Sequence, residues 1–167
     1  MLFLSLAGLI LAGCQQNQDP VAVDLEAEAA AAKAMLGNFS RAMVIQDVDS
    51  MFSFIAEDAL ICGSDPSELL GKEKAMKIWK EMEGGPEIDF VFLDDYPLKV
   101  AADGNSAAAM QQFNIPSMIP GIPIRNTYYL NKIDGNWMIS YWSSSLIPKN
   151  EDLPEIIGAV AAKKPAE

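Results

Sequence analysis

Apolar residues between positions 25 and 43 recur at spacings of three and four, which is typical of one face of a helix. The positions are Leu25, Ala29, Ala32, Leu36, Phe39 and Met43. Asp19 followed by Pro20 offers an N-cap acceptor and a proline at the first helical position. The pattern therefore predicts a long helix that begins near residue 20 and ends at about Gln46.

Two shorter helices and one short strand are predicted next. Asp47 is an N-cap candidate for a second helix, whose apolar face runs over residues 48–55. Residues 59–62 are apolar and predict a short strand, and residues 63–66 (GSDP) predict the turn that follows it. A third amphipathic helix is expected over residues 72–83.

From residue 87 onward the pattern changes to that of β-strands. Four strands are predicted: residues 88–101 with a bend near 95–97, residues 106–115, residues 126–133 and residues 136–145. Asp134-Gly135 joins the last two strands as a tight hairpin, because both positions accept a positive φ. The proline-rich segment 115–123 predicts a protruding apolar loop, and an apolar stripe over residues 153–160 predicts a C-terminal helix.

Residues 1–14 form an apolar run that ends on Leu11-Ala12-Gly13-Cys14. This ending resembles the lipobox of bacterial lipoproteins, and a 13-residue helix of ~20 Å is shorter than the ~30 Å hydrocarbon core of a bilayer. The sequence therefore predicts a signal peptide over residues 1–13, lipidation of Cys14 and a polar tether over residues 14–23. We expect a lipid-anchored protein of the bacterial cell envelope with the bilayer as its partner, and Gln15 after the cysteine favours the outer membrane.

Composition narrows the possible chemistry. The formal net charge of −11 disfavours nucleic acid as a partner, because phosphate backbones are bound by clustered Lys and Arg. The chain contains no histidine, which excludes Ser-His-Asp and Cys-His nucleophiles and imidazole metal ligands. With Cys14 assigned to the lipid, Cys62 has no disulfide partner and is expected to be a small core residue. Asp94 and Asp95 are interpreted as solvated charges, and neither a metal site nor a cofactor is predicted.

Helices followed by antiparallel strands predict an α+β fold in which a curved antiparallel sheet wraps around the long N-terminal helix. Four segments carry a resemblance to the SnoaL-like branch of the nuclear transport factor 2-like superfamily. They are Gln46-Asp47-Val48-Asp49, Ile55-Ala56-Glu57-Asp58-Ala59, Gly71-Lys72-Glu73-Lys74-Ala75 and Asp134-Gly135-Asn136-Trp137-Met138-Ile139. The resemblance places the SnoaL-like domain at residues 24–147, with a helical tail at residues 148–167.

This resemblance implies a cystatin-like cone with an apolar pocket between the sheet and the helices. The candidate lining residues are Phe39, Met43, Trp79, Phe90, Phe92, Met110, Gln112, Tyr129 and Trp142. Gln112, Tyr129 and Asn114 are the polar groups expected to face inward, where each would need a hydrogen-bond partner.

The related ketosteroid isomerases use a tyrosine in the first helix and a carboxylate base after the first strand. Counting along this chain places Phe39 at the tyrosine position and Gly63 at the base position. A phenyl ring cannot donate a hydrogen bond to a developing oxyanion. Polyketide cyclases of the SnoaL type also use an acidic base, for which Asp65, Asp49 and Glu68 are the candidates.

Three functions remain open from the sequence. The preferred hypothesis is a non-catalytic lipoprotein that binds a small apolar ligand or a protein partner in the cone. The second is an isomerase, cyclase or related enzyme that acts on an apolar cyclic substrate with Asp65 or Asp49 as base. The third is a structural dimerisation module, because the loop at residues 115–124 and the C-terminal helix both offer apolar surface, and a homodimer is expected.

Overall fold

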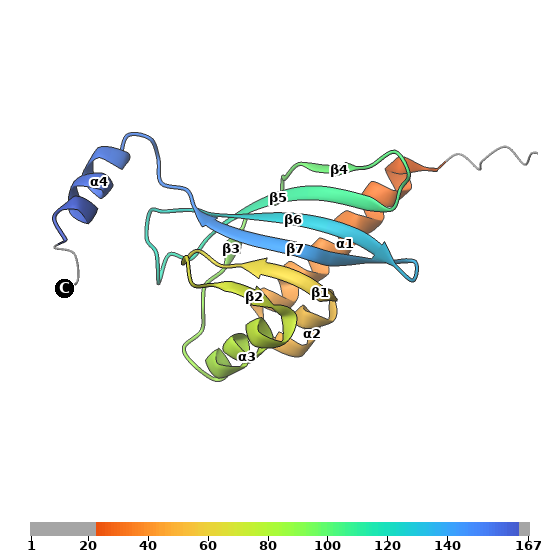
Figure 1. Ribbon diagram of the computed structural model, residues 1–167, viewed down its shortest axis with the longest axis horizontal. Coiled ribbons are helices and arrows are strands. Elements are labelled where there is room, and N and C mark those ends of the chain that lie inside the picture. Colours follow the sequence, from red (N-terminus) through yellow and green to blue (C-terminus); the bar gives the residue numbers. More distant parts are fainter. Residues whose placement is uncertain (1–22, 164–167) are drawn as a thin grey trace, which may run out of the picture.

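The long helix predicted by the apolar stripe opens the part of the chain that the structure describes. This computed structural model describes residues 23–163. Its helices are α1 (Leu25–Val44), α2 (Val48–Ser53), α3 (Lys72–Met82) and α4 (Leu153–Ala161). Its strands are β1 (Ile55–Cys62), β2 (Leu69–Gly71), β3 (Val91–Phe92), β4 (Leu98–Val100), β5 (Ser106–Asn114), β6 (Ile124–Ile133) and β7 (Asn136–Leu146). Figure 1 shows α1 crossing behind the sheet and α3 below it.

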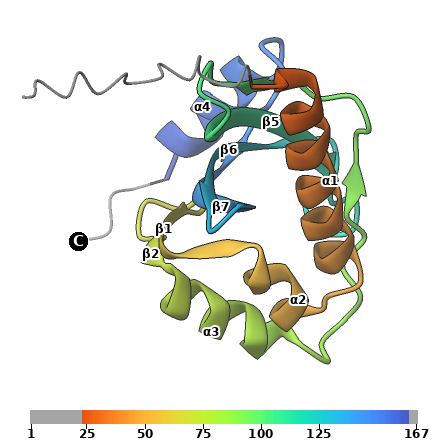
Figure 2. The ribbon, with the colours of Figure 1, turned by 90° about the vertical axis from the view of Figure 1, so that its right-hand side faces the viewer.

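The seven strands form one curved sheet in the order β2-β1-β7-β6-β5-β3, and β4 pairs separately with β5. All neighbours are antiparallel except β1 and β7, which run parallel. The sheet is curved around α1 as predicted, and one parallel pair makes it mixed where the sequence predicted antiparallel strands. The difference arises because β7, at the end of the chain's last hairpin, returns beside the early strand β1. Figure 2 shows the sheet curving around an interior that α1 and α3 close.

The inward face of α1 forms the centre of the core. Leu36, Phe39 and Met43 lie on this face and are fully buried. The helix begins at Leu25 because the Asp24 carboxylate accepts a hydrogen bond from the amide of Ala27 at 3.0 Å. The predicted start at residues 19–20 lies outside the described residues.

Several predicted boundaries were wrong, each for a local reason. Strand β1 begins at Ile55 rather than at residue 59, because Glu57 and Asp58 continue the strand with exposed side chains that interrupt its apolar pattern. The single strand predicted over residues 88–101 is two short strands, β3 and β4, separated by the segment that ends at Pro97. Strand β2 was not predicted.

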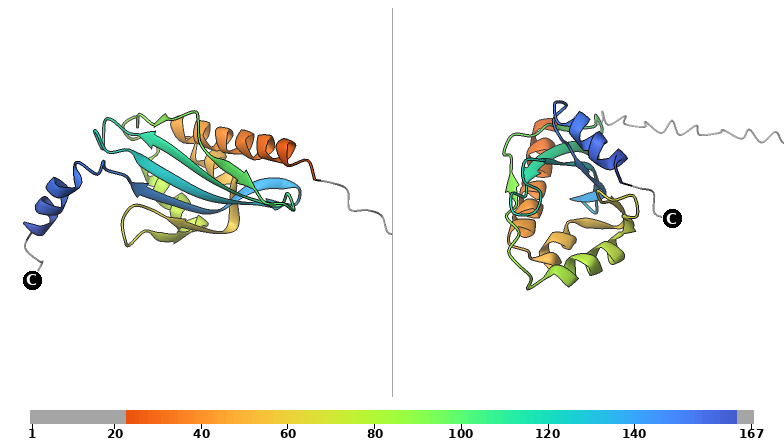
Figure 3. Two further views of the ribbon diagram at one scale, coloured as in Figure 1. Left: turned by 90° about the horizontal axis from the view of Figure 1, so that it is seen from above. Right: turned by 90° about the vertical axis from the view of Figure 1, so that its left-hand side faces the viewer.

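The C-terminal helix α4 forms as predicted and lies apart from the rest of the fold. Figures 1 and 3 show it beyond the end of β7, away from the other helices. None of its residues is buried, and Ile157 and Val160 are exposed. Within residues 23–163, no helix combines the length and apolar character needed to cross a bilayer.

Candidate functional site

A cavity of about 300 Å³ lies between α3, the concave face of the sheet and three connecting segments. This volume is at the lower end of the range for small-molecule sites. Most of its lining is apolar, and Glu68 is the one charged side chain among the described residues that line it. The lining residues are Met43, Ile61, Cys62, Gly63, Ser64, Glu68, Leu70, Ala75, Ile78, Trp79, Met82, Ile88, Phe90, Phe113, Ile115, Met118, Ile119, Ile124, Trp142 and Ser144.

Aromatic rings from α3, the sheet and the segment before β3 build one wall of the cavity. The Trp79 ring stacks on Phe90 at a centroid distance of 6.2 Å and lies 6.1 Å from the ring of Trp142. Phe39 contacts Trp142 edge-on at 5.5 Å but does not line the cavity. Phe39 therefore supports the wall from behind.

Trp142 contributes a polar group as well as apolar surface. Its Nε1–H is buried and has no hydrogen-bond partner among the residues that the structure describes. A buried donor without a partner costs roughly 1–3 kcal/mol. Trp142 therefore gives ring surface to the wall, while its buried indole N–H is left unpaired among the described residues.

A buried polar network adjoins the cavity. The Ser40 hydroxyl donates to Gln111 Oε1 at 3.0 Å, and Asn126 Nδ2 donates to the Tyr128 hydroxyl at 2.8 Å. Ser144, which lines the cavity, donates to Asn126 Oδ1 at 2.7 Å. Burial raises the pKa of Tyr128 far above its usual range, so its hydroxyl stays protonated.

Four of the predicted pocket residues line the cavity: Met43, Trp79, Phe90 and Trp142. Phe92 lies behind it, partly buried, with its ring 4.9 Å from that of Phe113. Phe113 is the residue of β5 that lines the cavity.

Met110, Gln112 and Tyr129 were assigned to the wrong face of the sheet. Met110 is 44% exposed and Tyr129 is 46% exposed, whereas Gln111 and Tyr128, their neighbours in sequence, are buried. Side chains alternate between the two faces of a strand, so an error of one residue moves the whole set to the other face. The inward polar residues are Gln111, Asn126 and Tyr128 instead of Gln112, Asn114 and Tyr129.

Neither predicted aspartate lines the cavity. Asp65 lies in the turn between β1 and β2, where its carboxylate accepts hydrogen bonds from the Ser67 hydroxyl at 2.5 Å and from the Ser67 amide at 2.8 Å. These bonds hold the pKa of Asp65 below its usual value. A carboxylate stabilised in its charged form is a weaker base.

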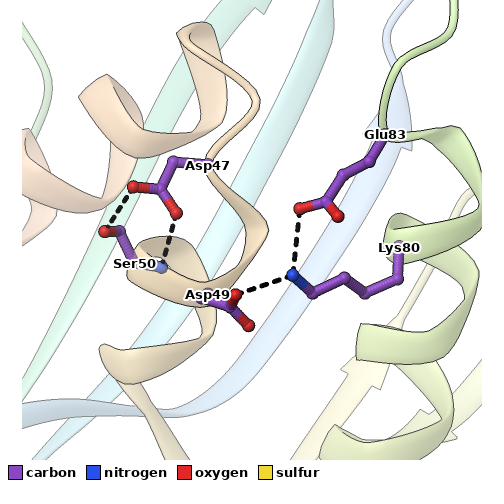
Figure 4. A network of polar contacts seen from close by, with 5 residues as sticks. All are labelled: Asp47, Asp49, Ser50, Lys80 and Glu83. Atoms are coloured by element: carbon purple, nitrogen blue, oxygen red, sulfur yellow. Dashed lines mark hydrogen bonds and ion pairs between the residues drawn. The ribbon is translucent and has the colours of Figure 1, made fainter.

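Asp49 belongs to an ion-pair network between α2 and α3. Its carboxylate lies 2.8 Å from Lys80 Nζ, and the same ammonium lies 3.1 Å from Glu83 (Figure 4). Asp47 in turn accepts hydrogen bonds from the hydroxyl and amide of Ser50 at the start of α2. These contacts link the two helices on the surface, away from the cavity lining.

The turn at residues 63–68 places a different carboxylate at the cavity. Glu68 folds back over Gly63, and its Oε2 accepts a hydrogen bond from the amide of Asp65 at 3.1 Å. Cys62, predicted as a core residue, is partly exposed and lines the cavity beside this turn. Among residues 23–163 no group of three or more acidic or cysteine side chains is arranged to hold a metal ion.

Solved structures with the same architecture define the class of fold. A protein of unknown function from Pectobacterium atrosepticum superposes with a TM-score of 0.64 at 17% identity, covering 77% of this chain and 97% of that one. A cystatin-like fold protein from Burkholderia xenovorans gives 0.62 at 16% identity, covering 74% and 94%. A ketosteroid isomerase-like protein from Erwinia carotovora atroseptica gives 0.57 at 16% identity, covering 73% and 98%. The fold is thus the cystatin-like α+β cone.

The sequence gives the family within this class. Residues 32–149 match the model of the SnoaL-like domain. This chain belongs to the SnoaL-like domain family, as its four sequence segments predicted. No curated protein matches the sequence.

Proposed function

We propose that this protein binds a small, mainly apolar molecule in the cavity and does not transform it. The main support for this proposal is the cavity itself, a space of about 300 Å³ lined mostly by aliphatic, methionine and aromatic side chains. Burial of apolar ligand surface there supplies roughly 25 cal/mol per Å². Met82 and Met118 lie on the side that opens toward solvent, and flexible methionines adapt to ligands of different shape.

Three positions in the chain are our reason for proposing that the bound molecule is not transformed. The resemblance puts an oxyanion donor at position 39, and Phe39 is a fully buried hydrocarbon ring. It puts a base at position 63, which is Gly63. Asp65 is held in its charged form by Ser67 outside the lining. These positions supply neither the oxyanion donor nor the base that the isomerase reaction requires.

Fluorescence of N-phenyl-1-naphthylamine, which increases in apolar surroundings, tests the binding proposal. We expect saturable binding that Ile78→Trp weakens at least about tenfold, because Ile78 lines the cavity and is 39% exposed at its mouth. Ile133→Trp is the matched control, since Ile133 is 40% exposed and lies outside the lining. Equal loss in both variants, or no saturable binding by the unaltered protein, would refute the proposal.

We also propose that acylated Cys14 anchors the protein to the outer membrane of a bacterial cell. The support is the sequence Leu11-Ala12-Gly13-Cys14 at the end of an apolar leader. Two or three acyl chains give stable attachment, whereas a single chain gives marginal binding. Cys14→Ser should move the protein to the soluble fraction, and Cys62→Ser, the matched control, should leave it with the membrane. Membrane association of the Cys14→Ser variant would end this proposal.

A homodimer through the outer face of the sheet is a third proposal, favoured by uncharged residues at the centre of that face. Tyr129 pairs across β6 and β7 with Tyr141, and Ala108 and Met110 continue the same face on β5. These four residues carry no charge, in a chain with a net charge of −11, and Lys99 and Arg125 lie beside them on the same face. Sedimentation at several concentrations should show a dimer that Tyr129→Glu dissociates, because a carboxylate would then be buried without a partner. A monomer at every concentration would exclude the dimer.

A further inference from the structure

Of the described residues that line the cavity, Glu68 is the only charged one, and most of the others are apolar. It comes from the turn between β1 and β2 and is partly buried there. Charged side chains rarely lie against apolar surface unless they are paired. Among the described residues Glu68 forms no ion pair with Lys or Arg. Its carboxylate is therefore available to a ligand.

The backbone of the turn holds Glu68 over Gly63. The Gly63 amide donates to the Glu68 carbonyl at 2.9 Å, and the Glu68 amide donates to the Asp65 carbonyl at 3.0 Å. A Cβ added to Gly63 would lie 2.7 Å from Glu68 Cδ and 2.8 Å from Glu68 Cβ. Such approaches are shorter than van der Waals contact, so only glycine at position 63 leaves room for the Glu68 side chain in this position.

The lining of the cavity and of the groove beside it carries acidic side chains. Among the residues that the structure describes, no Lys or Arg belongs to either lining. An adjoining groove shares Met82, Ile88 and Met118 with the cavity lining and carries Glu81 and Glu87. Like charges repel at short range, so this mouth disfavours carboxylates and phosphates and favours cations.

We infer that the ligand is an amphiphilic amine, whose protonated nitrogen pairs with Glu68 and whose apolar body lies against Trp79 and Phe90. This inference rests on the proposed function, because it names the ligand class of the same cavity. An ammonium supplies the donors that an acceptor-only carboxylate needs, and ionised hydrogen bonds are the stronger kind. The apolar lining selects the body of the ligand, and Glu68 selects the charge of its polar end.

Displacement of N-phenyl-1-naphthylamine by three compounds of equal chain length tests the inference. The competitors are octylamine, octanol and octanoate at pH 7, where the amine is cationic and the acid is anionic. We expect octylamine to displace the probe at a concentration about tenfold or more below that of octanoate, with octanol between them. No preference for the amine in the unaltered protein would overturn the inference.

Two variants in the turn distinguish the effect of the Glu68 carboxylate from the effect of the net charge of the turn. Glu68→Gln should abolish the preference for octylamine over octanol. Asp65→Asn removes the same amount of charge from the same turn, outside the lining, and should keep the preference. Retention of the preference in Glu68→Gln, or equal loss in both variants, would overturn the assignment of Glu68.

Gly63→Ala keeps the carboxylate but displaces it, so it should also reduce the preference for octylamine. An unchanged preference in this variant would show that the position of Glu68 does not matter and would overturn the inference. Failure of the probe to bind the unaltered protein would refute the proposed function instead. Binding of the probe and octanol without a preference for the amine would refute the amine inference alone.

Discussion

Replacing Asn126 by alanine should destabilise the protein more than replacing Ser144, its hydrogen-bond partner in the polar network. Asn126 is fully buried, and its side chain makes two hydrogen bonds. It donates to the Tyr128 hydroxyl at 2.8 Å and accepts from the Ser144 hydroxyl at 2.7 Å. Tyr128 then keeps only its 3.5 Å contact with Gln111, which is long for a hydrogen bond.

The expected loss can be worked from these contacts. Each hydrogen bond contributes about 1 kcal/mol net, and a buried hydroxyl left without a good partner costs roughly another 1–3 kcal/mol. Ser144 is only partly buried and can be rehydrated, so its share of the penalty is small. The sum for Asn126→Ala is about 3–5 kcal/mol, and Ser144→Ala alone should cost about 1 kcal/mol.

Urea unfolding followed by tryptophan fluorescence measures these free energies. The double variant Asn126→Ala/Ser144→Ala should be less destabilised than the sum of the single variants by about 1 kcal/mol, because the two residues share one hydrogen bond. An Asn126→Ala variant within about 0.5 kcal/mol of the unaltered protein would refute the assignment of the network. Exact additivity would refute the Asn126–Ser144 bond.

Two further predictions concern the core and the acid response. Phe39→Ala should lower the free energy of unfolding by urea by about 3–5 kcal/mol, because it empties the space behind Trp142. Met110→Ala, at an exposed position, should change it by less than about 0.5 kcal/mol. Similar losses in the two variants would contradict the burial of Phe39 and the exposure of Met110. Hydrogen bonding to Lys132 lowers the pKa of Glu28, so this contact stabilises the fold above the ordinary glutamate pKa and is lost as pH falls through the lowered pKa. Glu28→Gln should lower the urea midpoint at pH 6, and the midpoints of the variant and the unaltered protein should converge near pH 3. A difference between the midpoints that stays constant with pH would contradict this prediction.

Local signals in the sequence predicted the elements that depend on them. The stripe through Leu36, Phe39 and Met43 predicted α1, and Asp134-Gly135 predicted the β6–β7 hairpin, where both residues adopt a positive φ. The parallel pairing of β1 with β7 joins segments about 80 residues apart, which no local pattern reports. The mixed sheet was therefore not predictable from periodicity.

The face of each inner strand was also not fixed by local pattern. Strand β5 contains Ala107-Ala108-Ala109 and Gln111-Gln112, and β6 contains Tyr128-Tyr129, so equal residues occupy both faces. The alternation of residue types then does not indicate which face of the strand is buried. The register with the neighbouring strand determines it. The candidates on helices did not depend on this choice, and two of them, Met43 and Trp79, line the cavity.

The turn that contains Glu68 shows a different limit of prediction from sequence. The sequence directed attention to Asp65, because it follows the first strand where a base is expected. Asp65 instead fixes the turn through Ser67, and Glu68 is the residue that reaches the cavity. Gly63 next to this segment was the available signal, because a glycine allows another side chain to occupy the space beside it.

The central place of β7 has a consequence for folding. This strand is the last in the chain, yet it lies between β1 and β6 and supplies buried Trp137, Ile139 and Trp142. Before residues 136–146 are available, β1 has only the three-residue strand β2 beside it, and α1 has an incomplete surface to cover. Contacts between residues so far apart in the sequence form late and slow folding. The domain therefore acquires its native state only after nearly all of it has been synthesised, and a ribosome-bound fragment that stops before β7 remains open to proteases.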